Sequence, residues 1–343
     1  MTDLSAMEIY QELPQTDCGE CNFPTCMAFA MQLASKQVSL DQCPYVTEEA
    51  REALSASSAP PMGIVTLGEG EHEVEIGGET VEFRHEEKFY RPTGVGIRIG
   101  DGLGVAEVEK KVEKINSLKF ERIGEEISVD LVTVENSELS PGEFGEFVAR
   151  VDKNTQLPLI IYSDNPEAVK EGLENYSGEK PLIGKARKEN RSEMAQLSVD
   201  YECPLAVEGR DAEELAELTT EIEDEGVEDM VLAPDCGSLN EYLGTLTELR
   251  RLAVNEEFSP LGYPVWVSAN SDVPFQNVAN GTVGILKYAS ILTLDTFKRW
   301  QILPLLTVRQ HVYIDPQVQN SVEARLYEVG DPGPESPVLF TTN

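Results

Sequence analysis

Four of the six cysteines lie in the first 43 residues, with the spacing Cys18-x2-Cys21-x4-Cys26-x16-Cys43. Gly19 and Pro24 are turn-forming residues between the first three, so the backbone can bend enough to bring these thiolates around one centre. Four sulfur ligands without a histidine suit a 4Fe-4S cluster, and the order of their spacings differs from that of plant-type 2Fe-2S proteins. The alternatives are a structural zinc site on the same cysteines, although the second pair lacks the usual short knuckle spacing, and unrelated core thiols. We therefore expect a 4Fe-4S cluster.

The segment around Cys26, TCMAFAMQLASK, predicts a helix next to this cluster. The face that we expect to pack toward the cluster consists of Met27, Ala30, Met31 and Ala34. Three acidic side chains flank the cysteines, namely Asp17, Glu20 and Asp41. Uncompensated negative charge beside a cluster disfavours an added electron, so we expect a low reduction potential.

The composition is strongly acidic, with 27 Lys and Arg against 62 Asp and Glu and a formal net charge of -35. This balance argues against a nucleic-acid partner held by phosphate neutralisation. The acidic residues are spread along most of the chain, which we interpret as adaptation of the surface to salt. No run approaches the ~18 apolar residues of a membrane span, and the N-terminus lacks the basic start and apolar core of a signal peptide. We expect a cytoplasmic protein without a membrane partner.

Eight short apolar segments predict buried strands. They are 95–101, 127–135, 158–164, 181–187, 204–209, 229–235, 264–270 and 291–297. Each is followed by a segment of helical periodicity, such as DAEELAELTTEIEDEG. Eight such units predict an α/β fold in which a closed parallel (β/α)8 TIM barrel follows the small N-terminal 4Fe-4S domain, not an open doubly wound sheet. In front of the barrel, VEIGGETVEFR (74–84) predicts a β-hairpin that covers it, with the turn at Gly77-Gly78.

We divide the chain into three parts. Residues 1–61 form the cluster domain and a linker, because residues 47–61 run from a short helical pattern into Ser, Ala and Pro. Residues 62–313 form the TIM-barrel domain with its N-terminal hairpin. Residues 314–343 end in the apolar segment VLFTTN, which we interpret as a connection to a further domain that this chain does not contain.

Polar residues follow several of the predicted strands, at the end where barrels carry their chemistry. They are Asp101, Glu135, Asp164, Asp235, Asn270 and Asp295. Such side chains could bind an aminopyrimidine ring, but Asp and Asn are also the preferred N-caps of the helices that follow. We interpret Cys203 and Cys236 as isolated core thiols, His85 and His311 as scattered residues without a metal or base role, and the glycine run VGIRIGDGLG as close packing.

Several long motifs resemble one protein family. They are TDCGECNFPTCMAFAMQLAS with DQCPYV, GGETVEFRHEEKFYRPTG, PLGYP, VGILKYASI with LLTVRQHVYIDPQ, and LYEVGDPGPESPVLFTTN. On these motifs the chain resembles, over essentially its whole length, the large (gamma) subunit family of the corrinoid iron-sulfur protein of the acetyl-CoA decarbonylase/synthase system. The resemblance implies an N-terminal 4Fe-4S domain, a TIM barrel and a C-terminal corrinoid domain. Asn22, where the family commonly has Gly, is a minor departure because Asn also tolerates turn geometry.

The resemblance implies a role in methyl transfer, as a non-autonomous subunit of the methyltransferase class. The family carries a methyl group from methyl-tetrahydropterin, through cobalt, to acetyl-CoA synthase. Cys18, Cys21, Cys26 and Cys43 match its cluster ligands, and the cluster reduces cobalt to Co(I). The implied partners are a small (delta) subunit in a heterodimer, acetyl-CoA synthase and the methyl-tetrahydropterin methyltransferase, and the anaerobic pathway implies sensitivity to oxygen.

The chain ends at Asn343, where the family continues into its corrinoid domain. We therefore expect a corrinoid (cobamide) only with that domain or a partner, and we expect Thr342 and Asn343 at the corrinoid edge. No Asp-x-His-x-x-Gly cobalt-ligand motif occurs in the sequence. Two other functions remain open: a pterin-binding barrel methyltransferase that acts on a separate corrinoid protein, and a stand-alone 4Fe-4S redox module. Pterin binding would favour the first, and failure to associate with a small subunit would favour the second.

Overall fold

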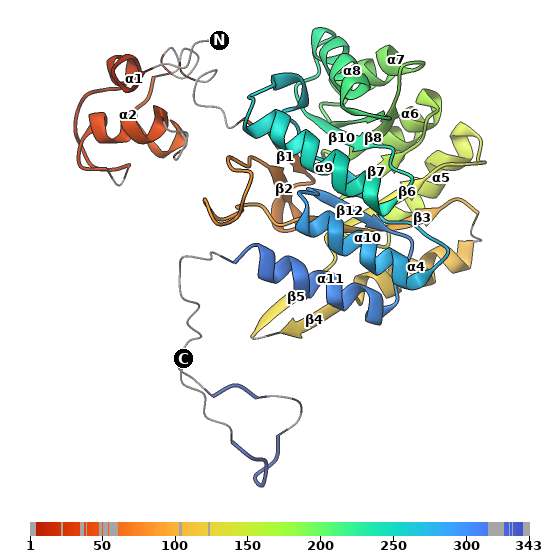
Figure 1. The fold of residues 1–343 in the computed structure, drawn as a ribbon. Helices are drawn as coiled ribbons and strands as arrows, with labels where there is room; N and C mark the ends of the chain where they lie inside the picture. Colours follow the sequence, from red (N-terminus) through yellow and green to blue (C-terminus); the bar gives the residue numbers. More distant parts are fainter. Residues whose placement is uncertain are drawn as a thin grey trace.

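The computed structural model contains an eight-stranded parallel β-barrel surrounded by helices, with a short helical segment before it in the chain (Figure 1). The structure describes residues 5–21, 23–34, 38, 40–47, 50, 54, 61–102, 105–122, 124–314, 326–328, 330 and 332–338. Strand and helix alternate eight times between Gly94 and Val312. The expected fold class, a TIM barrel of the α/β type, is therefore confirmed.

The barrel strands are β3 (Gly94–Gly100), β6 (Leu131–Glu135), β7 (Leu159–Tyr162), β8 (Leu182–Ala186), β9 (Leu205–Gly209), β10 (Met230–Pro234), β11 (Trp266–Ser268) and β12 (Ile291–Leu294). They lie in the order β10-β9-β8-β7-β6-β3-β12-β11, and a parallel bridge between Leu232 and Val265 joins the two outermost strands. The Leu232 N–H donates to the Pro264 carbonyl across this seam at 2.8 Å. Because both faces of each strand are covered, the strands are nearly continuous apolar runs, which is why the sequence locates them.

The outer ring consists of α4 (Val105–Asn116), α5 (Pro141–Asp152), α6 (Pro166–Asn175), α7 (Arg191–Asp200), α8 (Ala212–Asp224), α9 (Leu239–Val254), α10 (Pro274–Leu286) and α11 (Arg299–Val312). Polar N-caps begin several of these helices. Asp211 accepts the N–H of Glu214 at 2.9 Å, and Ser238 accepts the N–H of Glu241 at 3.3 Å. Among the helices of the described residues, none has both the length and the apolar character needed to cross a bilayer.

The predicted strand 127–135 is two strands in the structure. β5 (Glu125–Ser128) pairs antiparallel with β4 (Lys119–Arg122), and β6 begins only at Leu131. Asp130 lies between them, and its carboxylate accepts a backbone N–H of β3 at 2.8 Å. The prediction of one strand was wrong because a nearly unbroken apolar and polar alternation runs through this turn.

A two-stranded antiparallel hairpin covers the amino-terminal end of the barrel. β1 (Ile64–Leu67) pairs with β2 (Val74–Gly77), so the turn lies at residues 68–73 and the prediction of a turn at Gly77-Gly78 was wrong. Gly77 has a φ of 82° for another reason: a Cβ there would lie 2.2 Å from the Gly63 carbonyl oxygen. The hairpin packs on the first residues of the barrel strands in one apolar cluster, which contains Val65, Leu67, Ile76, Leu131, Ile160, Leu182, Ala206, Val231, Trp266 and Ile291.

The N-terminal segment has a small core of its own. It contains α1 (Ala6–Glu12), α2 (Cys26–Ala34) and the 3-10 turn η1 (Leu40–Gln42). A capping box of Ser5 and Glu8 begins α1. The buried residues of this core are Ile9, Leu13, Cys21, Cys26, Phe29, Ala30, Leu33, Leu40, Cys43 and Leu54. None of them belongs to the apolar clusters of the barrel.

Candidate functional site

The four predicted ligand cysteines lie together in the N-terminal segment. Cys21, Cys26 and Cys43 are buried, whereas Cys18 is exposed. Burial raises the pKa of the Cys43 thiol, a backbone hydrogen bond at Tyr45 opposes this rise, and the charges of the other three thiols add to it. Cys21, Cys26 and Cys43 also belong to one apolar cluster, so the fold places the cysteines in the same neighbourhood. Their role as cluster ligands stays a prediction.

Hydrogen bonds to the N-terminus of α2 hold the loop that carries the first cysteines. The Asp17 carboxylate accepts the N–H of Cys26 at 2.7 Å, and the Thr25 hydroxyl accepts the N–H of Ala28 at 3.1 Å. Asp17 (φ 47°) and Gly19 (φ 76°) adopt left-handed conformations that bend the chain between these points. This N–H group and the helix N-terminus offset part of the negative charge of Asp17, and the expected low potential stays a prediction.

Glu20 is the second acidic neighbour of the cysteines. The Tyr45 hydroxyl donates to both of its carboxylate oxygens at 3.0 Å, and this hydrogen bond raises the pKa of Tyr45. This neutral hydroxyl stabilises the negative charge of the Glu20 carboxylate but does not neutralise it. The side chain of Asp41, the third acidic neighbour, lies outside the described residues. The expected low potential therefore depends on Glu20 more than on Asp17.

α2 buries a different face from the predicted one. The buried residues are Cys26, Phe29, Ala30 and Leu33, and Met31 is 56 % exposed. Phe29 packs against Phe23 with ring centroids 5.7 Å apart. The prediction of the face was wrong because nearly every residue of CMAFAMQLA is apolar, so periodicity does not select a side. Phe29 and Leu33 contribute the apolar wall around the cysteines.

The donor set fits an iron-sulfur cluster better than a single ion. Within the described residues, no group of three or more His, Cys, Asp or Glu side chains is arranged to hold one metal ion. Around a tetrahedral zinc the sulfurs would be only ~3.8 Å apart, as Zn–S bonds of about 2.3 Å require. In a cubane cluster each sulfur binds a different iron, so the sulfurs are spaced more widely. Four thiolate donors without a histidine suit such a cluster.

A network of charged side chains occupies the carboxyl end of the barrel, which we call the mouth. Arg98 on β3 donates to Asp295 at 2.8 Å and pairs with Glu135 at 3.0 Å. Lys185 approaches the same Glu135 at 3.7 Å. Asn270 joins the group when its amide nitrogen donates to Asp295 at 3.0 Å and its oxygen accepts from Arg98 at 2.7 Å. The structure thus brings together three of the six predicted strand-end residues: Glu135, Asn270 and Asp295.

The network continues around Tyr162 at the end of β7. The Tyr162 hydroxyl donates to Glu208 at 2.8 Å, Glu208 also pairs with Arg187, and the Lys185 ammonium lies 4.3 Å from the Tyr162 ring centroid. Burial, reinforced by the Glu208 charge, raises the pKa of Tyr162 far above its ordinary value, so the hydroxyl stays protonated. Only the structure identifies Arg98, Lys185 and Glu208 as candidates, although each is a charged residue within an apolar strand.

The other predicted strand-end residues have different surroundings. The Asp101 carboxylate accepts the backbone N–H groups of residues 137–139 at 2.6, 2.7 and 3.2 Å. Burial acts to raise the pKa of Asp101, but these hydrogen bonds outweigh it and lower the pKa. Asp101 therefore holds the loop before α5. Neither Asp164 nor Asp235 makes a side-chain hydrogen bond or ion pair with the mouth network in the part of the chain that the structure describes.

The remaining candidates lie outside both sites. Cys203 is buried in the barrel core, where burial raises its pKa to about 12. Burial also raises the pKa of Cys236, which is partly buried. Both are protonated thiols of low reactivity, in keeping with isolated core cysteines. Thr342 and Asn343, predicted at a corrinoid edge, fall outside the described residues.

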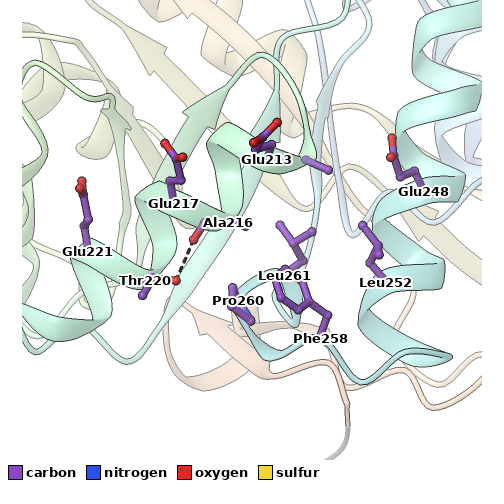
Figure 2. Close-up of a pocket in the computed structure, with 11 residues that line it drawn as sticks. Glu213, Ala216, Glu217, Thr220, Glu221, Glu248, Leu252, Phe258, Pro260 and Leu261 are labelled. Carbon is purple, nitrogen blue, oxygen red and sulfur yellow. Dashed lines mark hydrogen bonds between the residues drawn. The ribbon is translucent and has the colours of Figure 1, made fainter.

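An open groove of about 810 Å³ runs along the outside of the helix ring between α8 and α9 (Figure 2). Apolar side chains line its floor, among them Leu252, Phe258 and Leu261. Carboxylates stand along its rim, from Glu213, Glu217, Glu221 and Glu248. Since acidic residues are spread along most of this chain, the carboxylates of the rim identify no ligand, and we assign the groove no function.

Comparison with family models gives two matches. Residues 64–343 match the CO dehydrogenase/acetyl-CoA synthase delta subunit family, and residues 13–45 match an Fe-S cluster family. The second match includes all four clustered cysteines, so the expected iron-sulfur motif is confirmed.

Full-length relatives extend these matches. The chain is 42 % identical over 340 residues to the corrinoid/iron-sulfur protein large subunit of Moorella thermoacetica, which covers 99 % of this chain and 76 % of that protein. It is 36 % identical over 357 residues to the acetyl-CoA decarbonylase/synthase complex subunit gamma of Methanopyrus kandleri, covering 100 % of this chain and 77 % of that protein. Among solved structures, dihydropteroate synthase of Xanthomonas albilineans aligns with a TM-score of 0.50 and 20 % identity over 66 % of this chain and 94 % of that one. This last likeness supports the barrel fold alone.

Proposed function

Because the chain belongs to the family of corrinoid/iron-sulfur protein large subunits, the gamma subunits of the acetyl-CoA decarbonylase/synthase complex, we propose that it is the iron-sulfur and barrel subunit of a corrinoid methyl carrier. This carrier moves a methyl group from methyl-tetrahydropterin to acetyl-CoA synthase. The observation that carries the proposal is the similarity over 99 % of the chain, with the cysteine segment included. The proposed partners are the small (delta) subunit, acetyl-CoA synthase and the methyl-tetrahydropterin methyltransferase, all in the cytoplasm.

The proposal divides the chain by task. Residues 1–61 hold the cluster and the linker, residues 62–313 form the barrel that docks the small subunit, and residues 314–343 lead toward the corrinoid. The separate apolar core of the N-terminal segment supports the first of these boundaries. The corrinoid itself is proposed to be held by a further domain or by a partner.

Cys18, Cys21, Cys26 and Cys43 would hold a 4Fe-4S cluster in the N-terminal segment. When bound, the cluster supplies one electron, which converts Co(II) of an oxidised corrinoid to the nucleophilic Co(I) state. The protein positions the thiolates through the loop that Asp17 ties to α2 and surrounds three of them with apolar side chains. The exposed Cys18 marks the side of the site that faces solvent, where an electron acceptor can approach.

Anaerobic purification tests the cluster. We expect brown protein with about four irons per chain and a paramagnetic signal after reduction with dithionite. Cys21→Ser should lose both iron and signal, whereas Cys236→Ser, at a partly buried cysteine of the barrel, should keep both. Colourless protein that contains one zinc would contradict the assignment.

The electron role is tested with a free corrinoid. The chain is reduced, separated from excess dithionite and mixed with a Co(II) corrinoid, and the absorption of Co(I) is followed. One Co(I) should form for each cluster oxidised, and the Cys21→Ser chain should form none. A fully loaded chain that forms no Co(I) would contradict the electron role while leaving the cluster assignment intact.

The charged mouth favours a second candidate, a barrel that binds methyl-tetrahydropterin itself. Glu135, Asn270 and Asp295 offer hydrogen-bond acceptors of the kind that an aminopyrimidine ring needs. Calorimetric titration of the chain with methyl-tetrahydropterin separates the candidates. Binding that Asp295→Asn weakens by about tenfold would favour the second, and no measurable binding would favour the first.

A further inference from the structure

One sector of the helix ring lacks the acidic residues found elsewhere on the chain. Residues 273–314, which include α10 and α11, contain one acidic residue, Asp295, against four Lys and Arg. α10 has no charged residue and α11 has no acidic one, whereas α8 has six acidic residues in thirteen. On a surface adapted to salt by carboxylates, their depletion marks a face that does not remain in contact with water.

The same sector exposes large apolar side chains at the first turns of α10 and α11. We call Val273, Phe275, Trp300 and Leu303 the α10–α11 patch. Phe275 is 77 % exposed and Trp300 is 47 % exposed, and their ring centroids lie 5.2 Å apart. Exposed aromatic pairs in a surface depleted of acidic residues are typical of the centres of protein–protein interfaces.

A buried glutamine fixes the geometry of the patch. The Gln301 side chain is 2 % exposed, donates to the Pro274 carbonyl at 2.8 Å and accepts the hydroxyl hydrogen of Thr296. The bond to Pro274 ties the first turn of α11 to the first turn of α10, so the backbone that carries Phe275 and Trp300 is fixed before any partner arrives. A preformed surface loses little conformational entropy on binding.

The charge around the patch selects the occupant. Lys298 and Arg299 are exposed and directly precede Trp300, the exposed Asp272 directly precedes Val273, and Asp295 is paired with Arg98, so the net charge around the patch is positive. Two copies of this chain placed patch to patch would bring these positive charges together. The complementary surface is an apolar socket edged by carboxylates on a different protein.

We propose that the α10–α11 patch docks the partner subunit of the carrier through an acidic-edged apolar socket on that subunit. The identity of the partner rests on the proposed function, and the position of the contact rests on the patch. Because α10 and α11 begin at the carboxyl end of the barrel, the docked subunit lies beside the mouth (Figure 1).

Calorimetry with the separately purified small subunit of the same organism tests this docking. The wild-type chain should bind with a 1:1 stoichiometry, and Phe275→Ala and Trp300→Ala should each weaken binding by at least about 30-fold. Lys298→Glu, which changes only an exposed rim charge, should weaken it by about 3–10-fold, mainly through slower association. Phe258→Ala removes another exposed aromatic, in the α8–α9 groove, and should leave the affinity unchanged.

The outcomes separate this inference from the function on which it rests. Unchanged affinity in all three patch variants would overturn the docking site and leave the proposed function standing. Failure of the wild-type chain to bind the small subunit would overturn the proposed partner and the docking with it. A dimer of the chain alone that Phe275→Ala dissociates would make a second copy the occupant and overturn the proposal. Lys298→Glu, fully on the surface, decides the matter if an aromatic variant does not fold.

Discussion

The N-terminal segment and the barrel differ in how much apolar surface supports their cysteines and charges. Among the described residues, the core of the segment contains ten buried side chains, three of which are cysteines, whereas the main barrel cluster contains 53. Small domains with few buried side chains usually need a metal or a crosslink. We therefore expect the stability of the segment, but not that of the barrel, to depend on what its cysteines bind.

The two regions also treat charge differently. In the mouth, Arg98 pairs with both Glu135 and Asp295. Beside the cysteines, the partner of Glu20 among the described residues is the Tyr45 hydroxyl, and no Lys or Arg occurs in the first 35 residues of the sequence. The mouth thus pairs its carboxylates with neighbouring positive charges, whereas the described residues beside the thiols keep a net negative charge.

Removal of iron should show most clearly that the stability of the N-terminal segment, and not that of the barrel, depends on the cluster. Stripping the cluster with a chelator should speed amide exchange in α2 by at least about 100-fold, because metal binding supplies the folding free energy there. Amides of strands β6 to β10 should keep their protection, as measured by hydrogen exchange and mass spectrometry. Cys26→Ser should reproduce the stripped pattern without a chelator. Equal loss of protection in the barrel would contradict the separation.

A cavity in the barrel core should instead destabilise the barrel and leave the iron content of the N-terminal segment unchanged. Ile97 on β3 is fully buried in the main cluster, so Ile97→Ala should lower the free energy of unfolding by about 2–5 kcal/mol, measured with urea. The matched variant Ile97→Val should lower it by about 0.5–1.5 kcal/mol. Iron content should be unchanged in both variants. Loss of iron from Ile97→Ala would instead mean that the segment and the barrel fold as one unit.

Much of the barrel could be predicted because its strands are short apolar runs, each followed by a polar turn and an amphipathic helix. The close approach of backbone segments that lie far apart in the sequence could not be predicted. Gly77 and Gly78 have the composition of a hairpin turn, yet their positive φ values serve close contacts with Gly63 and Arg91. A local pattern shows that the chain bends, but not which distant backbone comes near it.

In the cysteine site and the mouth, too, local sequence predicts the local features but not the contacts between distant segments. The spacing of the cysteines predicts which side chains meet, but the apolar helix α2 hides which of its faces is buried, so Phe29 was missed. At the mouth, Glu135 and Asp295 follow from their places at strand ends. The contact of Arg98 with both depends on register, which pairs Gly100 with Glu135 and so places Arg98 within reach of the neighbouring strand end. Register comes from tertiary packing, not from local sequence.

Acid should destabilise the barrel through protonation of Asp101. Burial opposes ionisation of this carboxyl, but its backbone hydrogen bonds to residues 137–139 lower its pKa below the ordinary value of 3.8. A depressed pKa in the folded state contributes stability above about pH 3.8, and that contribution is lost as the pH falls through the folded-state pKa. Asp101→Asn should lower the free energy of unfolding by about 1–3 kcal/mol at pH 7 and flatten its fall in acid. An unchanged acid profile would mean that water replaces these bonds without loss.

The smallest expected effect concerns the charge beside the cysteines, and it decides whether the contrast between the regions extends to electrostatics. Glu20→Gln should raise the midpoint potential of the cluster, because it removes a negative charge that disfavours the added electron. Tyr45→Phe removes the hydroxyl that donates to Glu20 at 3.0 Å, so the potential should fall slightly. In the double variant the Tyr45 substitution should have no effect, since no carboxylate remains for it to act on. Redox titrations at low and high salt measure these shifts, and salt should shrink them because both side chains are exposed. An unchanged midpoint in Glu20→Gln would mean that solvent screens the charge of this residue, and the two regions would then differ in core size alone.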